Sequence, residues 1–158
     1  MKTLRRFVQL PWTRQALLLE AAGWLALAWL LVRALPFRFW SRWLGTQSPG
    51  EVDHAGAERD PRVRDICLAI TAINAHLGGR LSCLMLAMAA QWMLSRRRIP
   101  SSLVLGTRTE QDAQKRLILN AHAWVRVGSG VVLGHHEDGY IPISSFVRHQ
   151  PSPKGQAE

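Results

Sequence analysis

The sequence predicts an α+β domain in which helices come first and an antiparallel sheet follows. Apolar residues recur at helical spacing up to Pro100, whereas short β-branched runs separated by glycine dominate after it. Of the 158 residues, 47% are hydrophobic and 20% are charged. This composition suits a single domain with a core of its own and excludes a wholly disordered chain. Helices and strands segregated in this order are typical of α+β folds.

Residues 1–45 form an apolar arm that is rich in tryptophan and arginine. Thr13 is a candidate N-cap for a helix that ends before Pro36. The run between Glu20 and Arg33 holds twelve uncharged residues, fewer than the roughly 18–20 that a bilayer span needs. Three interpretations remain open for the arm. It docks on the domain or on a partner protein, it lies in a membrane interface, or it spans a membrane.

The rest of the chain divides by composition. Residues 46–60 have the glycine, serine, proline and acidic content of a linker. Residues 61–149 carry the periodic apolar patterns and form the main domain. Residues 150–158 are a polar tail with two prolines, predicted to be disordered.

Two helices are expected at the start of the main domain. Asp60 can cap the first, which has proline at its first position and runs over residues 61–77. The Gly-Gly pair at 78–79 ends it. Ser82 can then cap a second, strongly apolar helix that carries Cys83 in its first turn. The positive end of the helix dipole and its unpaired N–H groups favour a thiolate at that place.

Short strands are expected after Pro100. The pattern predicts strands over residues 102–107, 117–127, 130–133 and 140–143, with a polar surface loop at 108–116. Alternation along the second strand puts His122, Trp124 and Arg126 on one face and Ala121, Ala123, Val125 and Val127 on the other.

Cys83 and His122 are a candidate nucleophile and base. A cysteine hydrolase needs a thiol, a histidine that carries the proton, and a third group that orients the imidazole. Glu137 and Asp138 are the acidic candidates for the third position. Asp138 is preferred, because an Asp-Gly pair shapes a turn and a short side chain orients an imidazole more rigidly.

Each of these residues also has a purely structural interpretation. Cys83 and Cys67 can be small core residues, and Cys67, inside the first helix, is expected to be only that. His122 can be a structural histidine, and Asp138 a turn residue. The run His135-His-Glu137 resembles a metal site, but adjacent side chains on a strand point to opposite faces, so no metal and no cofactor are expected.

The net charge of +9 favours an acidic partner, such as a membrane surface or an acidic peptide. Nucleic acid is not expected, since the sequence has no zinc-finger spacing or RNA-recognition motif. The basic run at 96–98 closes a helix, where it complements the helix dipole, and a partner-binding patch is the alternative. The two cysteines lie in apolar surroundings, which favours free thiols and a cytoplasmic location.

Three pieces of sequence together resemble a known family. They are Cys83-Leu at the start of an apolar helix, Arg98-Ile-Pro-Ser-Ser-Leu-Val-Leu-Gly106, and Ala121-His-Ala-Trp-Val125. Over roughly residues 60–148 the chain resembles the bacterial leader peptidases of lasso-peptide biosynthesis. These are B proteins in their short split form, without a leader-recognition domain, and they are transglutaminase-like cysteine peptidases. Arg126 is a departure, since an acidic residue commonly follows His-Ala-Trp-Val in that family.

The resemblance implies a papain-like cysteine protease core with Cys83 as nucleophile, His122 as base and then acid, and Asp138 completing the triad. It also implies three partners: the lasso-peptide precursor, a separate leader-recognition protein, and an asparagine-synthetase-like macrolactam cyclase, which would be the component that uses ATP. Two other functions stay open. One is a non-catalytic scaffold held at a membrane by residues 1–45, and the other is acyl transfer to a different peptide.

Overall fold

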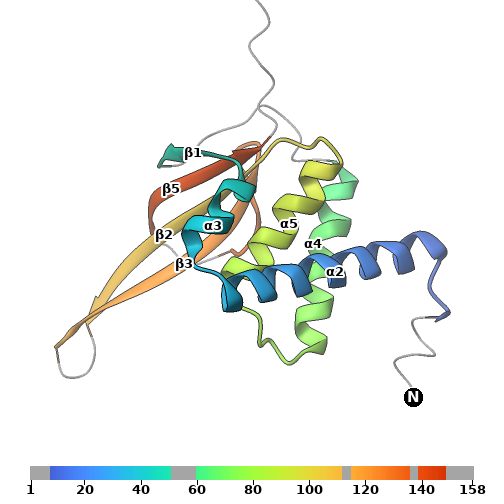
Figure 1. The fold of residues 1–158 in the computed structure, drawn as a ribbon, viewed down its shortest axis with the longest axis horizontal. Coiled ribbons are helices and arrows are strands. Elements are labelled where there is room, and N and C mark those ends of the chain that lie inside the picture. Colours follow the sequence, from blue (N-terminus) through green and yellow to red (C-terminus); the bar gives the residue numbers. More distant parts are fainter. Residues whose placement is uncertain (1–7, 51–59, 112–114, 136–138, 149–158) are drawn as a thin grey trace, which may run out of the picture.

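The computed structural model describes residues 8–50, 60–111, 115–135 and 139–148. Within them a layer of helices packs on a five-stranded antiparallel sheet, as Figure 1 shows, and the predicted α+β class is confirmed. The helices are α2 (Trp12–Ala34), α3 (Phe37–Trp40), the 3-10 helix η1 (Ser41–Leu44), α4 (Pro61–His76) and α5 (Cys83–Arg96). The strands are β1 (Thr46–Pro49), β2 (Ser101–Gln111), β3 (Leu117–Val127), β4 (Gly130–Leu133) and β5 (Ile141–Arg148).

Helix α5 is the centre of the fold. Ten of its 14 residues are buried, because it contacts α2 and α4 as well as the sheet. Its apolar residues pack on the sheet face that carries Leu103, Ala123, Val125 and Phe146. The buried Gln91 side chain donates a hydrogen bond to the Phe146 carbonyl, which ties α5 to β5. The start of α5 is thereby held at a fixed place beside the sheet.

The turn between α4 and α5 sets where α5 begins. Gly78 and Gly79 have φ angles of +72° and +70°, which only glycine adopts without strain. The Gly79 N–H donates to the Asn74 carbonyl at 2.8 Å and closes the end of α4. The Asn74 side chain then accepts from the Leu81 N–H at 3.2 Å, just before the first residue of α5.

The N-terminal arm docks on the helical layer. Helix α2 begins at Trp12, after Pro11, so Thr13 lies inside the helix and its predicted capping role is wrong. The inner face of α2 packs on α4 and α5 through Ala21, Leu25, Ala28 and Leu31. By length and apolar composition alone α2 is able to cross a membrane, although 22% of its most apolar window is buried in the protein.

The sheet has the order β1-β5-β2-β3-β4. Residues 46–49, expected in a linker, instead form the edge strand β1 and pair with residues 144–147 of β5. The expected loop at 108–116 is also partly wrong, because residues 108–111 pair with residues 117–120 and extend β2. Both departures arise from pairing between segments, which local composition does not encode. The tail at 150–158 lies outside the described residues.

Candidate active site

The N-terminus of α5 presents Cys83 together with free backbone donors. Ser82 is the N-cap: its Oγ accepts from the Met85 N–H at 3.4 Å, and its carbonyl accepts from the Leu86 N–H at 3.1 Å. Helix geometry leaves the N–H groups of Cys83 and Leu84 without partners inside the helix. These two donors lie next to the thiol, where the negative oxygen of a tetrahedral intermediate would form.

A pocket of about 380 Å³ opens at this helix end. Cys83 and His122 both line it, so the fold brings the predicted nucleophile and base to one site. The remainder of the lining is mostly apolar and comes from α3, α5, β2, β3 and β5: Phe37, Leu84, Leu105, Gly106, Thr107, Ala121, Ala123, Ile143 and Ser144.

The His122 imidazole is oriented by a backbone carbonyl. Its Nε2 lies 3.0 Å from the carbonyl oxygen of Gly134, the residue that follows β4. Because a carbonyl only accepts, Nε2 is the donor of this hydrogen bond. The ring also stacks on Trp124, at 6.0 Å between centroids, and lies 5.1 Å from the Tyr140 ring. These contacts fix the orientation of the ring.

The two residues reach the pocket from different layers. Alternation along β3 puts His122 on the same sheet face as Trp124, as predicted, while α5 packs against the face that carries Ala123 and Val125. Cys83 reaches the pocket from the helical layer, on the sheet side of Ala121 and Ala123, whereas the His122 ring lies with Trp124 on the other side of β3.

Gly134 is the functional residue that sequence reasoning missed. Its φ of +79° suits glycine, and a Cβ atom there would lie 2.8 Å from the Ala123 carbonyl oxygen. Glycine therefore allows β4 to turn close to β3 and to bring its carbonyl to His122. The only signal in the sequence was a glycine at the end of a short strand. The predicted triad acids, Asp138 and Glu137, lie outside the described residues, so their roles stay predictions.

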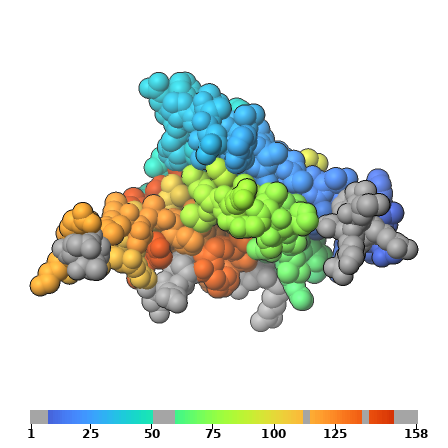
Figure 2. Space-filling model, turned by 90° about the horizontal axis from the view of Figure 1, so that it is seen from below, coloured from blue at the N-terminus to red at the C-terminus, as the bar shows by residue number. Residues whose placement is uncertain are grey.

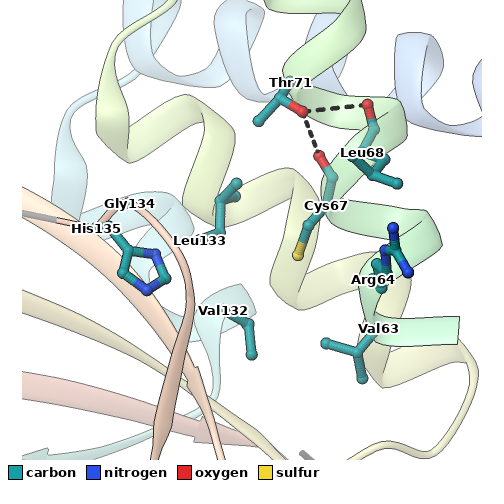
Figure 3. Close-up of a pocket in the computed structure, with 9 residues that line it drawn as sticks. All are labelled: Val63, Arg64, Cys67, Leu68, Thr71, Val132, Leu133, Gly134 and His135. Atoms are coloured by element: carbon teal, nitrogen blue, oxygen red, sulfur yellow. Dashed lines mark hydrogen bonds between the residues drawn. The ribbon is translucent and has the colours of Figure 1, made fainter. Parts of the chain in front are cut away.

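Cys67 lies in a different and larger pocket, of about 480 Å³, between α4 and the end of β4 (Figure 3). Burial raises the pKa of its thiol to about 11, which keeps it protonated and unreactive at neutral pH. The neighbouring Thr71 hydroxyl donates to the Cys67 backbone carbonyl at 2.8 Å. In Figure 3, His135 stands across this pocket from the sulfur.

Within the described ranges no three histidine, cysteine or carboxylate side chains gather into a metal-binding cluster. His135 is described and exposed, while residues 136–138 of the predicted His-His-Glu run lie outside the described part. The chemistry that the pocket itself supports is nucleophilic: a thiol, an imidazole and two backbone donors around an apolar cavity.

A family model confirms the fold that this geometry suggests. Residues 31–145 match the transglutaminase-like superfamily, so the match begins inside the arm and spans both α5 and β3. No curated protein and no solved structure matches the chain. Members of this superfamily commonly act as cysteine peptidases or acyltransferases. The chain belongs to the transglutaminase-like superfamily.

Proposed function

We propose that this protein is a cysteine peptidase that removes the leader from a lasso-peptide precursor. The observation that carries the proposal is the shared pocket of Cys83, at the N-terminus of α5, and His122 on β3. The sequence resemblance described above supplies the substrate class, and membership of the superfamily supports the chemistry.

In this mechanism the His122 imidazole accepts the thiol proton, and the Cys83 sulfur attacks the carbonyl carbon of the scissile peptide bond. The N–H groups of Cys83 and Leu84 stabilise the oxyanion. The imidazolium then gives its proton to the leaving amine, which departs as the new N-terminus of the core peptide, while the leader remains as a thioester on Cys83. Water, deprotonated by His122, hydrolyses the thioester and restores the thiol. The carbonyl of Gly134 holds the ring throughout, and Asp138 is the proposed additional acid.

An uncovered sheet face supports a peptide substrate. Beyond α5 the pocket-side face of the sheet continues through Ala121, Thr107 and Ile141, which are cross-strand neighbours, and through Leu119. Leu119 and Ile141 are 67% and 70% exposed, although both are large and apolar. This face can hold an extended apolar segment of the precursor next to the nucleophile.

The test is mass spectrometry of the precursor after incubation with the full-length protein and the separate leader-recognition protein. Wild type should release the leader, and Cys83→Ala and His122→Ala should not, with melting temperatures near that of the wild type. Cleavage by Cys83→Ala would refute the proposal. Asp138→Ala and Glu137→Ala in the same assay decide which acid contributes.

Acyl transfer starts from the same thioester and differs only in the acceptor. Adding a small primary amine to the reaction separates the two outcomes. A peptidase yields a free leader carboxylate, whereas an acyltransferase yields a leader whose mass is raised by the amine. Macrolactam closure is assigned to the partner cyclase, so this protein alone should produce a linear core peptide.

A further inference from the structure

Helix α2 is apolar on two opposite faces, and the protein covers only one of them. The inner face is buried against α4 and α5, as described above. The outer face carries Leu19, Trp29 and Leu30, which are 61%, 47% and 53% exposed. On the same face, between Leu19 and Trp29, lie the small residues Ala22, Gly23 and Ala26, all exposed. Packing within the chain explains the inner face and leaves the outer one without a partner.

The exposed apolar surface continues past the end of α2. Large side chains remain about half exposed through α3 and η1, namely Leu35, Phe37, Phe39 and Trp43. In Figure 2 the residues coloured blue to cyan form one continuous side of the molecule. Large contiguous apolar patches on a protein surface mark sites of protein or membrane contact. We call this side the arm surface: the outer face of α2 together with α3 and η1.

The charge of the N-terminal segment that carries the arm surface favours an anionic occupant. Residues 1–50 hold seven basic residues and one acidic residue, a net charge of +6 of the chain's total of +9. The one acid, Glu20, turns inward and pairs with Arg97, the C-cap residue of α5, at 2.7 Å. Arg33 and Arg38 are exposed, and their guanidinium groups lie over the exposed rings of Trp29 and Phe39, at 5.8 and 4.7 Å. Arginine and tryptophan side by side are typical of surfaces that settle into the headgroup region of a bilayer.

We propose that the arm surface binds an anionic membrane and that α2 lies in the plane of the interface. Spanning the membrane would require α2 to leave α5, which breaks the Glu20–Arg97 ion pair and exposes the inner apolar face. When α2 lies flat on the membrane, the ion pair stays intact and the inner apolar face stays buried. The Trp92 indole also donates to the Trp43 carbonyl at 3.0 Å and fastens the end of the arm to α5.

Membrane binding would place the catalytic pocket at the bilayer. Phe37 belongs to the arm surface and also lines the pocket of Cys83 and His122. The pocket mouth therefore lies beside the headgroups when the arm surface is bound. The proposal concerns where the protein works and holds whichever reaction the pocket catalyses.

The experiment is co-sedimentation of the full-length protein with vesicles. One set contains phosphatidylcholine alone, and the other contains phosphatidylcholine mixed with phosphatidylglycerol. We expect binding to the mixed vesicles, weaker binding to the neutral ones, and loss of the difference at high salt, where the charges are screened. The double variant Leu19→Glu/Leu30→Glu should lower the partition coefficient at least about tenfold, since two apolar anchors become charged.

Leu117→Glu is the matched control. It makes the same change at a leucine that is 71% exposed, on the distant β2–β3 hairpin, and should bind vesicles like the wild type. Arg38→Gln/Arg42→Gln is a second test that leaves every buried side chain in place, and it should lose the preference for anionic vesicles. Circular dichroism and melting curves verify that each variant is folded.

Three results would overturn membrane binding by the arm surface, and a fourth would overturn the in-plane arrangement of α2. The first is no binding to mixed vesicles, and the second is equal loss of binding in the Leu117→Glu control. The third is a wild-type dimer in light scattering that Leu19→Glu/Leu30→Glu converts to a monomer, which would make the arm surface a protein interface. Resistance of the membrane-bound protein to alkaline carbonate would indicate a spanning helix and refute the in-plane arrangement.

Discussion

Replacing Gly134 by alanine tests the hydrogen bond that orients His122. The new Cβ would lie 2.8 Å from the Ala123 carbonyl oxygen and 3.0 Å from the Trp124 Cα. Both distances are shorter than ordinary van der Waals contact of a Cβ atom. The φ of +79° adds a cost of about 1–2 kcal/mol for a residue with a Cβ. The backbone at residue 134 must therefore shift, and its carbonyl moves away from the His122 Nε2, with which it now bonds at 3.0 Å.

The expected consequence is a fall in kcat of about a hundredfold, because misplacing a catalytic group by roughly an ångström has an effect of that size. That factor corresponds to about 2.7 kcal/mol in the activation free energy. KM should change little, since residue 134 does not line the pocket that holds Cys83. NMR of the imidazole nitrogens should show the hydrogen fixed on Nε2 in the wild type and exchanging between nitrogens in the variant.

Gly78→Ala is the control for the backbone cost alone. Gly78 has a similar φ of +72°, and nothing lies within 4 Å of a Cβ built there. This variant should lose only the stability that the positive φ costs, while keeping kcat and the His122 tautomer. If Gly134→Ala keeps the wild-type kcat, or if kcat falls as far in Gly78→Ala, the Gly134 carbonyl does not position His122.

Three further predictions follow from the described contacts. Iodoacetamide at pH 8 should alkylate Cys83 and spare Cys67, whose pKa of about 11 leaves only about one thiol in a thousand ionised; peptide mapping that finds Cys67 modified first would contradict this. Glu20→Gln should destabilise the protein by about 1 kcal/mol at neutral pH. The hydrogen bond from Arg97 lowers the pKa of Glu20 below its usual 4.5, so this stabilisation is complete above that value and disappears as the pH falls through the lowered pKa. Thermal melts should show the gap to wild type closing on acidification, and a gap that widens would refute the assignment. Leu119→Glu, on the exposed sheet face beside the pocket, should raise KM for the precursor with little change in kcat, and an unchanged KM would remove that face from the substrate site.

The local elements of the site could be predicted from the sequence. Asp60 caps α4 through the Arg62 N–H at 2.9 Å, and Ser82 caps α5, as their positions before the apolar runs indicated. Cys83 therefore stands in the first turn of α5, and β3 spans the predicted residues 117–127. Caps and strand alternation involve neighbours in the chain, so a single sequence carries enough information to place them.

Contacts between distant segments were not predictable in the same way. The orientation of His122 depends on a carbonyl from Gly134, and a backbone carbonyl has no sequence signature. Residues 46–49 look like a linker, yet they form a strand because the edge of β5 offers them partners. Such pairings depend on the whole fold rather than on the local composition.

By itself, the sequence determined the α+β class, the cap that sets Cys83 at a helix start, and an arm with more apolar residues than one face of a helix needs. Only the tertiary structure decided that Cys83 and His122 share a pocket and which face of α2 stays exposed. The reason is physical. Helix capping and periodicity act over a few residues, whereas a pocket and an uncovered face exist only once distant segments have packed together.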